Sequence, residues 1–381
     1  MERIENVNPS RLKLCCKELG ITLDALAQEA SVPLENIQKV IEGTPGFTFL
    51  QLRKIANYFG RGVLFFLETG DIEIEQIHSS QFRTINNQKT TLSPRLRQLI
   101  ERVERQRQTY LDLREELGEP LVTFTPPANI SRRPAPAAKS TRAWLGLAKE
   151  RTFTGYREAV ERQGILVFRS NGYNGKWQVP KDDNVCGFSL YHKSWPLIFI
   201  RKEASESRQI FTMMHELGHL LLHKDSFVDD HDDLNSYAGK ERDANEFAGQ
   251  LLIPDPILAK IVDTQRPADV AEFDNWLKPY TSKLGLSPQA LLVRLLRVER
   301  LPQPVYKAYV DWKKQLPKAH ESGGNRSYRY REPKHLFGDK FVRTVLESLQ
   351  TRNISLAKAS TYLDNITIAD VHKLEGTYAE F

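Results

Sequence analysis

The sequence predicts an α+β protein made of more than one domain. Its 381 residues exceed the length of one average domain, and two to three domains are expected. Capping and breaking residues recur at short intervals near the amino terminus, which predicts a helical domain there. In the middle of the chain, an apolar stripe at helical spacing predicts a buried helix that carries the pattern H-E-x-x-H. Helical segments between residues 325 and 381 predict a small terminal unit.

Residues 1–78 are expected to form the all-helical domain. Ser10 and Thr22 are suited to cap helices, and Pro33 is suited to open one. The tight Ser31-Val32 turn between two short helices fits a helix-turn-helix. The arrangement resembles the repressor-type, XRE-like domain of phage regulators. The expected helices lie at residues 11–19, 23–30, 34–41 and 49–59.

Two uses of this domain stay open. Residues 1–70 contain eight basic and eight acidic side chains, so their net charge is zero. DNA binding draws much of its affinity from contacts between basic side chains and phosphates. Asn36, Gln38 and Lys39 on the third helix could reach bases, but Glu35 would then face the phosphates. The domain could instead dock onto a similar domain of a partner protein.

Residues 79–140 predict a basic helix followed by a linker. Between residues 80 and 150, thirteen Lys and Arg stand against seven Asp and Glu. Ser93 and Pro94 are suited to begin an amphipathic helix that ends near Leu117. Its arginine-rich side could grip nucleic acid or an acidic partner, or it could be the solvated side of a connector. The Pro- and Ala-rich residues 126–138 predict an extended linker.

The H-E-x-x-H pattern consists of His215, Glu216 and His219. Histidines at positions i and i+4 project from one face of a helix, so both can bind one zinc ion. Glu216 is placed beside the open position of the metal, where a carboxylate can take a proton from water. The alternative is an ordinary helix with surface polar groups. The surrounding apolar stripe argues against it, because buried histidines are costly without a metal or hydrogen bonds.

A third metal ligand is expected from a second helix that ends before Pro254. Glu241 and Asn245 are four residues apart and share one face of that helix. One of the two could bind the metal while the other hydrogen-bonds a ligand histidine. Between the two helices, the Asp-rich residues 225–235 predict a solvated, mobile loop. His223 is expected outside the set of ligands.

The H-E-L-G-H helix followed by E-x-x-A-N-x-F-A-x-x-L-L-I-P resembles the ImmA/IrrE family of metallopeptidases. The resemblance implies a zincin-like domain at residues 141–320. In that fold the H-E-x-x-H helix packs against a small mixed sheet, here formed by residues 164–168, 186–190 and the expected edge strand 196–200. It also implies a gluzincin-type site, with zinc bound by His215, His219 and Glu241 and with Glu216 as the general base.

The resemblance suggests two functional hypotheses. In the first, the chain is a zinc-dependent endopeptidase that cleaves a regulatory protein such as a repressor, and its helix-turn-helix serves DNA binding or partner docking. In the second, it is a non-catalytic DNA- or protein-binding regulator that acts as the antitoxin of a toxin–antitoxin pair. For the endopeptidase, Tyr191, His192 and Tyr237 are candidates for stabilising the oxyanion.

The carboxyl-terminal third of the chain predicts further helices. Ser287 and Pro288 are suited to begin a helix over residues 289–301. Residues 340–349, 356–363 and 368–375 predict the helices of the unit at 325–381, which resembles a second helix-turn-helix and is expected to serve docking.

Composition limits the location of the protein. No apolar run approaches the length of a membrane-spanning helix, and the first residues do not resemble a secretory signal. A cytoplasmic protein without membrane partners is therefore expected. Cys15 and Cys16 are adjacent and Cys186 is alone, which argues for reduced thiols and against disulfides.

Overall fold

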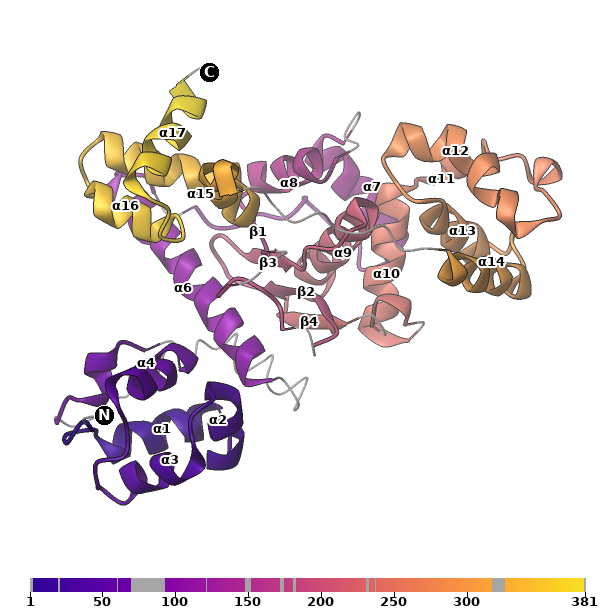
Figure 1. The fold of residues 1–381 in the computed structure, drawn as a ribbon. Coiled ribbons are helices and arrows are strands. Elements are labelled where there is room, and N and C mark those ends of the chain that lie inside the picture. The colour runs from indigo at the N-terminus through magenta and orange to yellow at the C-terminus, as the bar shows by residue number, and fades with distance from the viewer. Residues whose placement is uncertain are drawn as a thin grey trace. The chain divides into compact units, whose positions relative to one another are not determined.

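A computed structural model of the chain divides it into two compact units, Met1–Arg102 and Val103–Phe381. Figure 1 labels their helices and strands. Among the residues that the structure describes, no helix combines the length and the apolar character needed to cross a bilayer. The described residues are 3–19, 21–59, 61–69, 93–120, 122–147, 152–171, 175–180, 183–230, 233–236, 238–316 and 326–379.

The four helices predicted near the amino terminus are confirmed (Figure 1). Thr22 caps the second helix by accepting a hydrogen bond from the N–H of Ala25. Ser31 ends that helix in the left-handed conformation, with φ of 50°, and so turns the chain into the third helix. The first cap differs from the prediction, because Asn8 rather than Ser10 accepts from the first free N–H groups. The elements are α1 Pro9–Leu19, α2 Leu23–Ala30, α3 Leu34–Ile41, α4 Phe49–Tyr58 and the 3₁₀ turn η1 Val63–Phe66.

The predicted basic helix is confirmed as α6, Pro94–Glu116. Its first residues belong to the first unit, where Arg95 pairs with Glu29 at 2.5 Å. Further along, the prediction of a solvated arginine-rich side is wrong at Arg107, which is buried. Its guanidinium donates to the carbonyl oxygens of Ser194 and Trp195, at 2.5 and 2.7 Å. This arginine therefore stabilises a loop of the second unit and does not offer its charge to an external partner.

The second unit contains a mixed four-stranded sheet in the order β1-β3-β2-β4. The three predicted strands are present, and β3 pairs parallel to β1 and antiparallel to β2. Two predictions are wrong. β3 is an inner strand instead of the edge, and part of the acidic segment predicted as a loop forms a fourth strand on the β2 side. The strands are β1 Leu166–Arg169, β2 Val185–Leu190, β3 Leu197–Ile200 and β4 Phe227–Asp230.

Helices cover both faces of this sheet. Successive side chains of each strand point to opposite faces and pack against the helix on their own side. On one face, Val167 and Ile198 join the apolar core around α9, Glu206–Gly218. On the other, Phe168 lies against Phe337 and Phe341 of α15, Glu332–Gln350. The helix α10, Gly239–Leu252, packs on α9, and α7, Pro134–Leu145, packs on α10 (Figure 1).

The predicted extended linker is wrong over its second half, since residues 134–138 lie within α7. Pro134 and Pro136 stand in the first turn, where a missing N–H costs no hydrogen bond. Ala137 and Ala138 are buried in the core. The Pro- and Ala-rich composition therefore marks the start of a closely packed helix.

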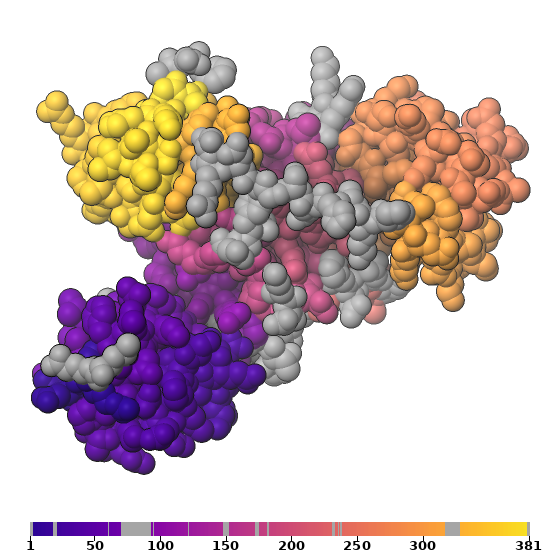
Figure 2. Space-filling view, viewed as in Figure 1, coloured from indigo at the N-terminus to yellow at the C-terminus, as the bar shows by residue number. Residues whose placement is uncertain are grey.

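Two groups of helices complete the second unit, and Figure 2 shows them as separate regions of its surface. One group contains the helix predicted after Ser287, which ends at Arg297, short of the predicted end at residue 301. It comprises α11 Asp255–Leu258, η4 Asp263–Gln265, η5 Val270–Glu272, α12 Phe273–Leu284, α13 Pro288–Arg297 and α14 Gln303–Gln315. The other comprises η6 Arg326–Arg331, α15, α16 Leu356–Tyr362 and α17 Ile368–Ala379.

The terminal helices are tied to the sheet through Arg157, which lies on α8, Phe153–Arg162. Its buried guanidinium donates to the carbonyl oxygens of Lys334 and His335, and it pairs with Glu161 at 3.0 Å. It also donates to the carbonyl oxygen of Val167 on β1. The unit expected at 325–381 therefore contributes part of the buried structure around the sheet.

Candidate metal centre

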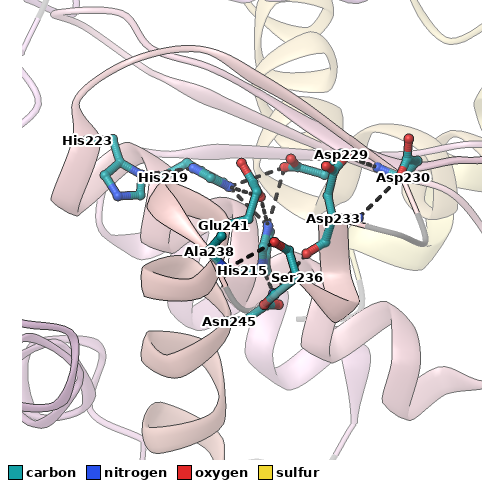
Figure 3. Close-up of polar contacts among 10 residues, drawn as sticks. All are labelled: His215, His219, His223, Asp229, Asp230, Asp233, Ser236, Ala238, Glu241 and Asn245. Carbon is teal, nitrogen blue, oxygen red and sulfur yellow. Dashed lines mark hydrogen bonds and ion pairs between the residues drawn. The ribbon is translucent and has the colours of Figure 1, made fainter. Parts of the chain in front are cut away.

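His215 lies in the last turn of α9, His219 follows one turn later, and both are fully buried. The helix is capped by Ser205, whose hydroxyl accepts from the N–H of Arg208. After Gly218 it continues as the wider π turn η2, His219–His223. The Nε2 atoms of the two histidines lie 3.0 Å apart and face the same point (Figure 3).

The structure brings Glu241 to this point from the first turn of α10. Its Oε2 atom lies 3.2 Å from Nε2 of His215 and 3.3 Å from Nε2 of His219. Gly218 lets the two helices come close, because a side chain there would meet Phe247 and Ala244 of α10 at 3.0 and 3.3 Å. The two histidines and the glutamate predicted from the sequence are thus close neighbours in space.

Asn245 fixes the orientation of the His215 ring through a hydrogen bond to its Nδ1 atom. Its Nδ2 donates to the carbonyl oxygens of Asp233 and Ser236, at 2.9 and 3.3 Å, which leaves Oδ1 facing the histidine. Because that oxygen can only accept, Nδ1 of His215 must donate to it, at 3.0 Å. When the ring is neutral, Nε2 then carries the lone pair that a metal needs. His223, placed outside the ligand set by the sequence, contacts Nδ1 of His219 at 2.9 Å.

Asp229 is a fourth member of the cluster that sequence reasoning missed. It was assigned to a solvated loop, but it lies on β4 and is buried. Its Oδ2 atom lies 3.5 Å from Nε2 of His215 and 3.4 Å from Nε2 of His219 (Figure 3). The available signal was the apolar pair Phe227-Val228 within the acidic segment, which is typical of a buried strand.

Glu216 is fully buried between α9 and the sheet. Its Oε1 atom occupies space left by Gly187 on β2, where a side chain would approach it to 2.9 Å. Burial, and next the negative charge of Asp229, raise the pKa of Glu216 well above its ordinary value. The Ser189 side chain lowers this pKa, but by less. Among the described residues, none gives either carboxylate oxygen a well-formed hydrogen bond.

The cluster fits a metal ion. One donor atom each from His215, His219, Asp229 and Glu241 lies within 4.8 Å of the other three. Oδ2 of Asp229 and Oε2 of Glu241 are buried and lack a hydrogen-bond partner among the described residues, which is costly unless a cation satisfies them. Two imidazole nitrogens and two carboxylate oxygens are a donor set that first-row divalent metals accept.

The carboxylates also favour the protonated form of His215. Burial alone lowers the pKa of His215, but its close interactions with the carboxylates of Asp229 and Glu241 outweigh burial and raise the pKa to about 9. Burial favours neutral Glu241, but its interactions with His215 and His219 outweigh burial and lower its pKa. In the absence of a metal, a proton on His215 therefore offsets part of the negative charge.

A cavity of about 440 Å³ adjoins the centre between α9, α10 and α13. Its wall includes Asn245, which hydrogen-bonds His215, and Phe211, whose ring centroid lies 6.5 Å from that of His215. The wall also contains Val293, Arg297 and the pair of Arg208 and Glu203, whose charged groups lie 3.5 Å apart. The cavity therefore presents both apolar and charged groups.

The remaining candidates lie elsewhere. Tyr191 and His192 follow β2, and Nε2 of His192 lies 3.9 Å from a carboxylate oxygen of Glu104. Burial, and then the charge of Arg107, lower the pKa of His192 to about 3, so its ring is neutral. Tyr237 is outside the described residues.

The candidate DNA contacts lie on α3 in the first unit. Asn36 accepts a hydrogen bond from Arg3 at 3.4 Å, and Lys39 is paired with Glu35. Gln38 is exposed.

Residues 160–296 match the peptidase family described as the IrrE N-terminal-like domain. The matched segment contains the sheet, α9, α10 and all four members of the cluster. It supports the ImmA/IrrE family and suggests a metallopeptidase-type function. A search of curated proteins found no match to the chain.

Proposed function

We propose that the chain is a zinc-dependent endopeptidase that cleaves a regulatory protein such as a repressor. The match of residues 160–296 supports a peptidase. The observation that carries the proposal is the convergence of His215, His219 and Glu241 from two helices, with Glu216 beside the first histidine. A purely structural metal site would have no chemical need for that buried glutamate.

His215, His219 and Glu241 would hold the zinc ion as a gluzincin-type set. When bound, zinc supplies Lewis acidity, which polarises a peptide carbonyl and acidifies water. The hydrogen bond between His215 and Asn245 fixes the tautomer that presents Nε2 to the ion. Asn245 therefore acts as a positioning residue.

Glu216 would act as the general base. Its buried carboxylate takes a proton from the water that attacks the peptide carbonyl carbon. It then gives that proton to the amide nitrogen as the carbon–nitrogen bond breaks. Because burial raises its pKa, this carboxylate holds the proton more strongly than an exposed glutamate would. The products are a carboxylate and an amine, and Glu216 returns to its initial state.

The first unit would recruit the partner protein, a helix-turn-helix repressor or a cognate toxin. The pairing of Lys39 with Glu35 removes a cation that DNA binding would use. Phe49, Leu50 and Leu64 are large apolar side chains that are 57%, 50% and 73% exposed, which favours contact with a protein. DNA binding through Asn36, Gln38 and Lys39 is the alternative use of this unit.

The test compares wild type with Glu216→Gln. The amide cannot accept a proton at neutral pH, so zinc content and folding should be preserved while cleavage falls about 10²- to 10⁴-fold. Each protein is added to extracts of its source cells, and new amino termini are quantified by mass spectrometry. Glu246→Gln, which lies on α10 but outside the cluster, is the matched control. Equal yields of new termini from wild type and Glu216→Gln would refute the mechanism.

A second candidate is a non-catalytic antitoxin. The observation in its favour is the fourth carboxylate, because zinc sites with four protein ligands are usually structural. Under this hypothesis Glu216→Gln would neutralise the partner as well as the wild type does, and extracts would contain no new termini.

A further inference from the structure

We propose that Asp229 is a fourth metal ligand, and that β4 thereby holds the proposed peptidase in a closed state. The site opens when this strand releases the carboxylate and frees a coordination position for water and substrate. The inference rests on the proposed function, since it concerns how that same site is regulated.

The distances among the four donor atoms carry the assignment. A tetrahedral zinc site with bonds of about 2.0–2.2 Å has donor atoms about 3.3–3.6 Å apart. The two Nε2 atoms lie 3.0 Å apart, and Glu241 lies 3.2 and 3.3 Å from them. Asp229 lies 3.5 and 3.4 Å from the same nitrogens. Its carboxylate is therefore as well placed for a ligand as that of Glu241.

The strand is shaped to direct Asp229 inward. Phe227 and Asp229 are two residues apart and share one face of β4. The ring of Phe227 stacks on His219, with centroids 3.9 Å apart. Opposite Asp229, the pairing of β2 shifts by one residue between Val185 and Gly187. Such bulges redirect side chains beside functional sites.

In the closed arrangement, water cannot reach the position that the reaction requires. Asp229 and Glu216 are both almost completely buried, and their carboxylates are close neighbours. With four protein ligands, a tetrahedral ion has no position left for a water molecule. Glu216 then has no water from which to take a proton.

Release of β4 would break its pairing with β2 and uncover the buried side chains of Phe227 and Val228. It is a four-residue edge strand, and within the described residues it pairs with β2 alone. Its carboxyl end is fixed by reciprocal bonds in which the N–H groups of Asp230 and Asp233 donate to each other's side chains. The carbonyl of Asp233 also accepts from Asn245, which in turn bonds His215. Movement of Asp233 would therefore shift Asn245 and alter its hydrogen bond to His215.

The test examines coordination in the full-length protein. Wild type, Asp229→Ala and the control Asp243→Ala are loaded with Co(II), and bound water is detected by electron–nuclear double resonance in isotopically labelled water. We expect no water ligand in wild type or the control, and one in Asp229→Ala. Acetohydroxamate, a small metal-binding probe, should then bind the Asp229→Ala protein at least tenfold more tightly than wild type.

A water ligand in wild-type protein would overturn the closed-state proposal by itself, even if Asp229→Ala failed to fold. It would leave the proposed peptidase intact. Purified wild type that binds no metal would contradict both proposals. Cleavage that is insensitive to Glu216→Gln would contradict only the peptidase mechanism.

Discussion

His215 is the side chain on which the polar contacts of the metal centre converge. Asn245 holds its Nδ1, while Asp229 and Glu241 lie within reach of its Nε2. The two carboxylates raise the pKa of this histidine to about 9, against the effect of burial. At neutral pH the metal-free protein therefore carries a proton at the nitrogen that a metal would bind.

Zinc affinity should consequently rise with pH. Below pH 9 the ion must displace the proton of His215, and above it no proton has to leave. We expect the apparent association constant to increase about tenfold per pH unit between pH 6 and 8, with about one proton released per zinc from this group. Calorimetry in buffers of different ionisation enthalpy counts the protons. A pH-independent affinity would show that the carboxylates do not hold a proton on His215.

Residue spacing along a helix explains which members of the site could be predicted. His215, His219, Glu241 and Asn245 each belong to a pair at i and i+4, and that spacing alone puts both members of a pair on one face. Asp229 has no such relation to the other ligands. Its position depends on which strand β4 pairs with and on the bulge opposite it, and both are set by tertiary structure.

At the scale of elements, β2 and α9 approach each other so closely that there is no room for a side chain at position 187, which is a glycine. A methyl group there would lie 2.8 Å from Cγ2 of Thr212, 2.9 Å from Glu216 and 3.0 Å from the carbonyl oxygen of Phe199. The position of the proposed base therefore depends on a strand residue that has no side chain.

Gly187→Ala should destabilise the protein by about 1–3 kcal/mol, because the strand or α9 must shift. Gly376→Ala, in the open surroundings of α17, is the matched control and should stabilise it by about 0.5–1 kcal/mol. Urea denaturation measures both changes. Equal stability of the two variants would mean that the sheet and α9 can separate without cost.

The elements that prediction missed had ambiguous sequences. In α7, Pro134 and Pro136 occupy positions that tolerate proline, so a proline-rich segment can begin a helix as well as form a linker. The strand β4 has only four residues, two of them acidic. Periodicity cannot identify so short a strand, and its burial comes from contacts with η2 and β2.

At the scale of the whole molecule, the chain's net positive charge is unevenly distributed, and part of it is not available to bind DNA phosphates. The first 70 residues have no net charge, and Lys39 is paired within its own helix. The excess of basic residues lies between residues 80 and 150, where Arg107 is buried and bonded to backbone carbonyls. The positive charge of the chain is thus a poorer indication of DNA binding than its total suggests.

A fragment of residues 1–69 should therefore bind DNA weakly at physiological salt. Any affinity of the full-length protein should fall steeply as salt rises, because each neutralised phosphate contributes about 0.9 to the log–log slope. Titration of a fluorescent duplex with the fragment and with the full chain, at several salt concentrations, tests this. Tight binding of one sequence by the fragment alone would instead assign a repressor-like role to the first unit.

The terminal helices could be predicted as elements but not as part of the second unit. Their apolar residues have helical spacing, yet that spacing does not reveal which surface they cover. Phe337 and Phe341 pack on the sheet, and Arg157 binds the carbonyls of Lys334 and His335. A fragment limited to residues 160–296 would lack these residues and would expose Phe168 on the sheet face that they cover.

The bulge that directs Asp229 inward also contains Cys186. The burial of this cysteine governs how the protein responds to thiol reagents. Only a thiolate reacts readily with alkylating agents or peroxides. Burial raises the pKa of Cys186 far above its ordinary value and that of Cys16 to about 11, and Cys15 is buried as well. Iodoacetamide and mild oxidants should thus leave the folded protein unmodified at neutral pH.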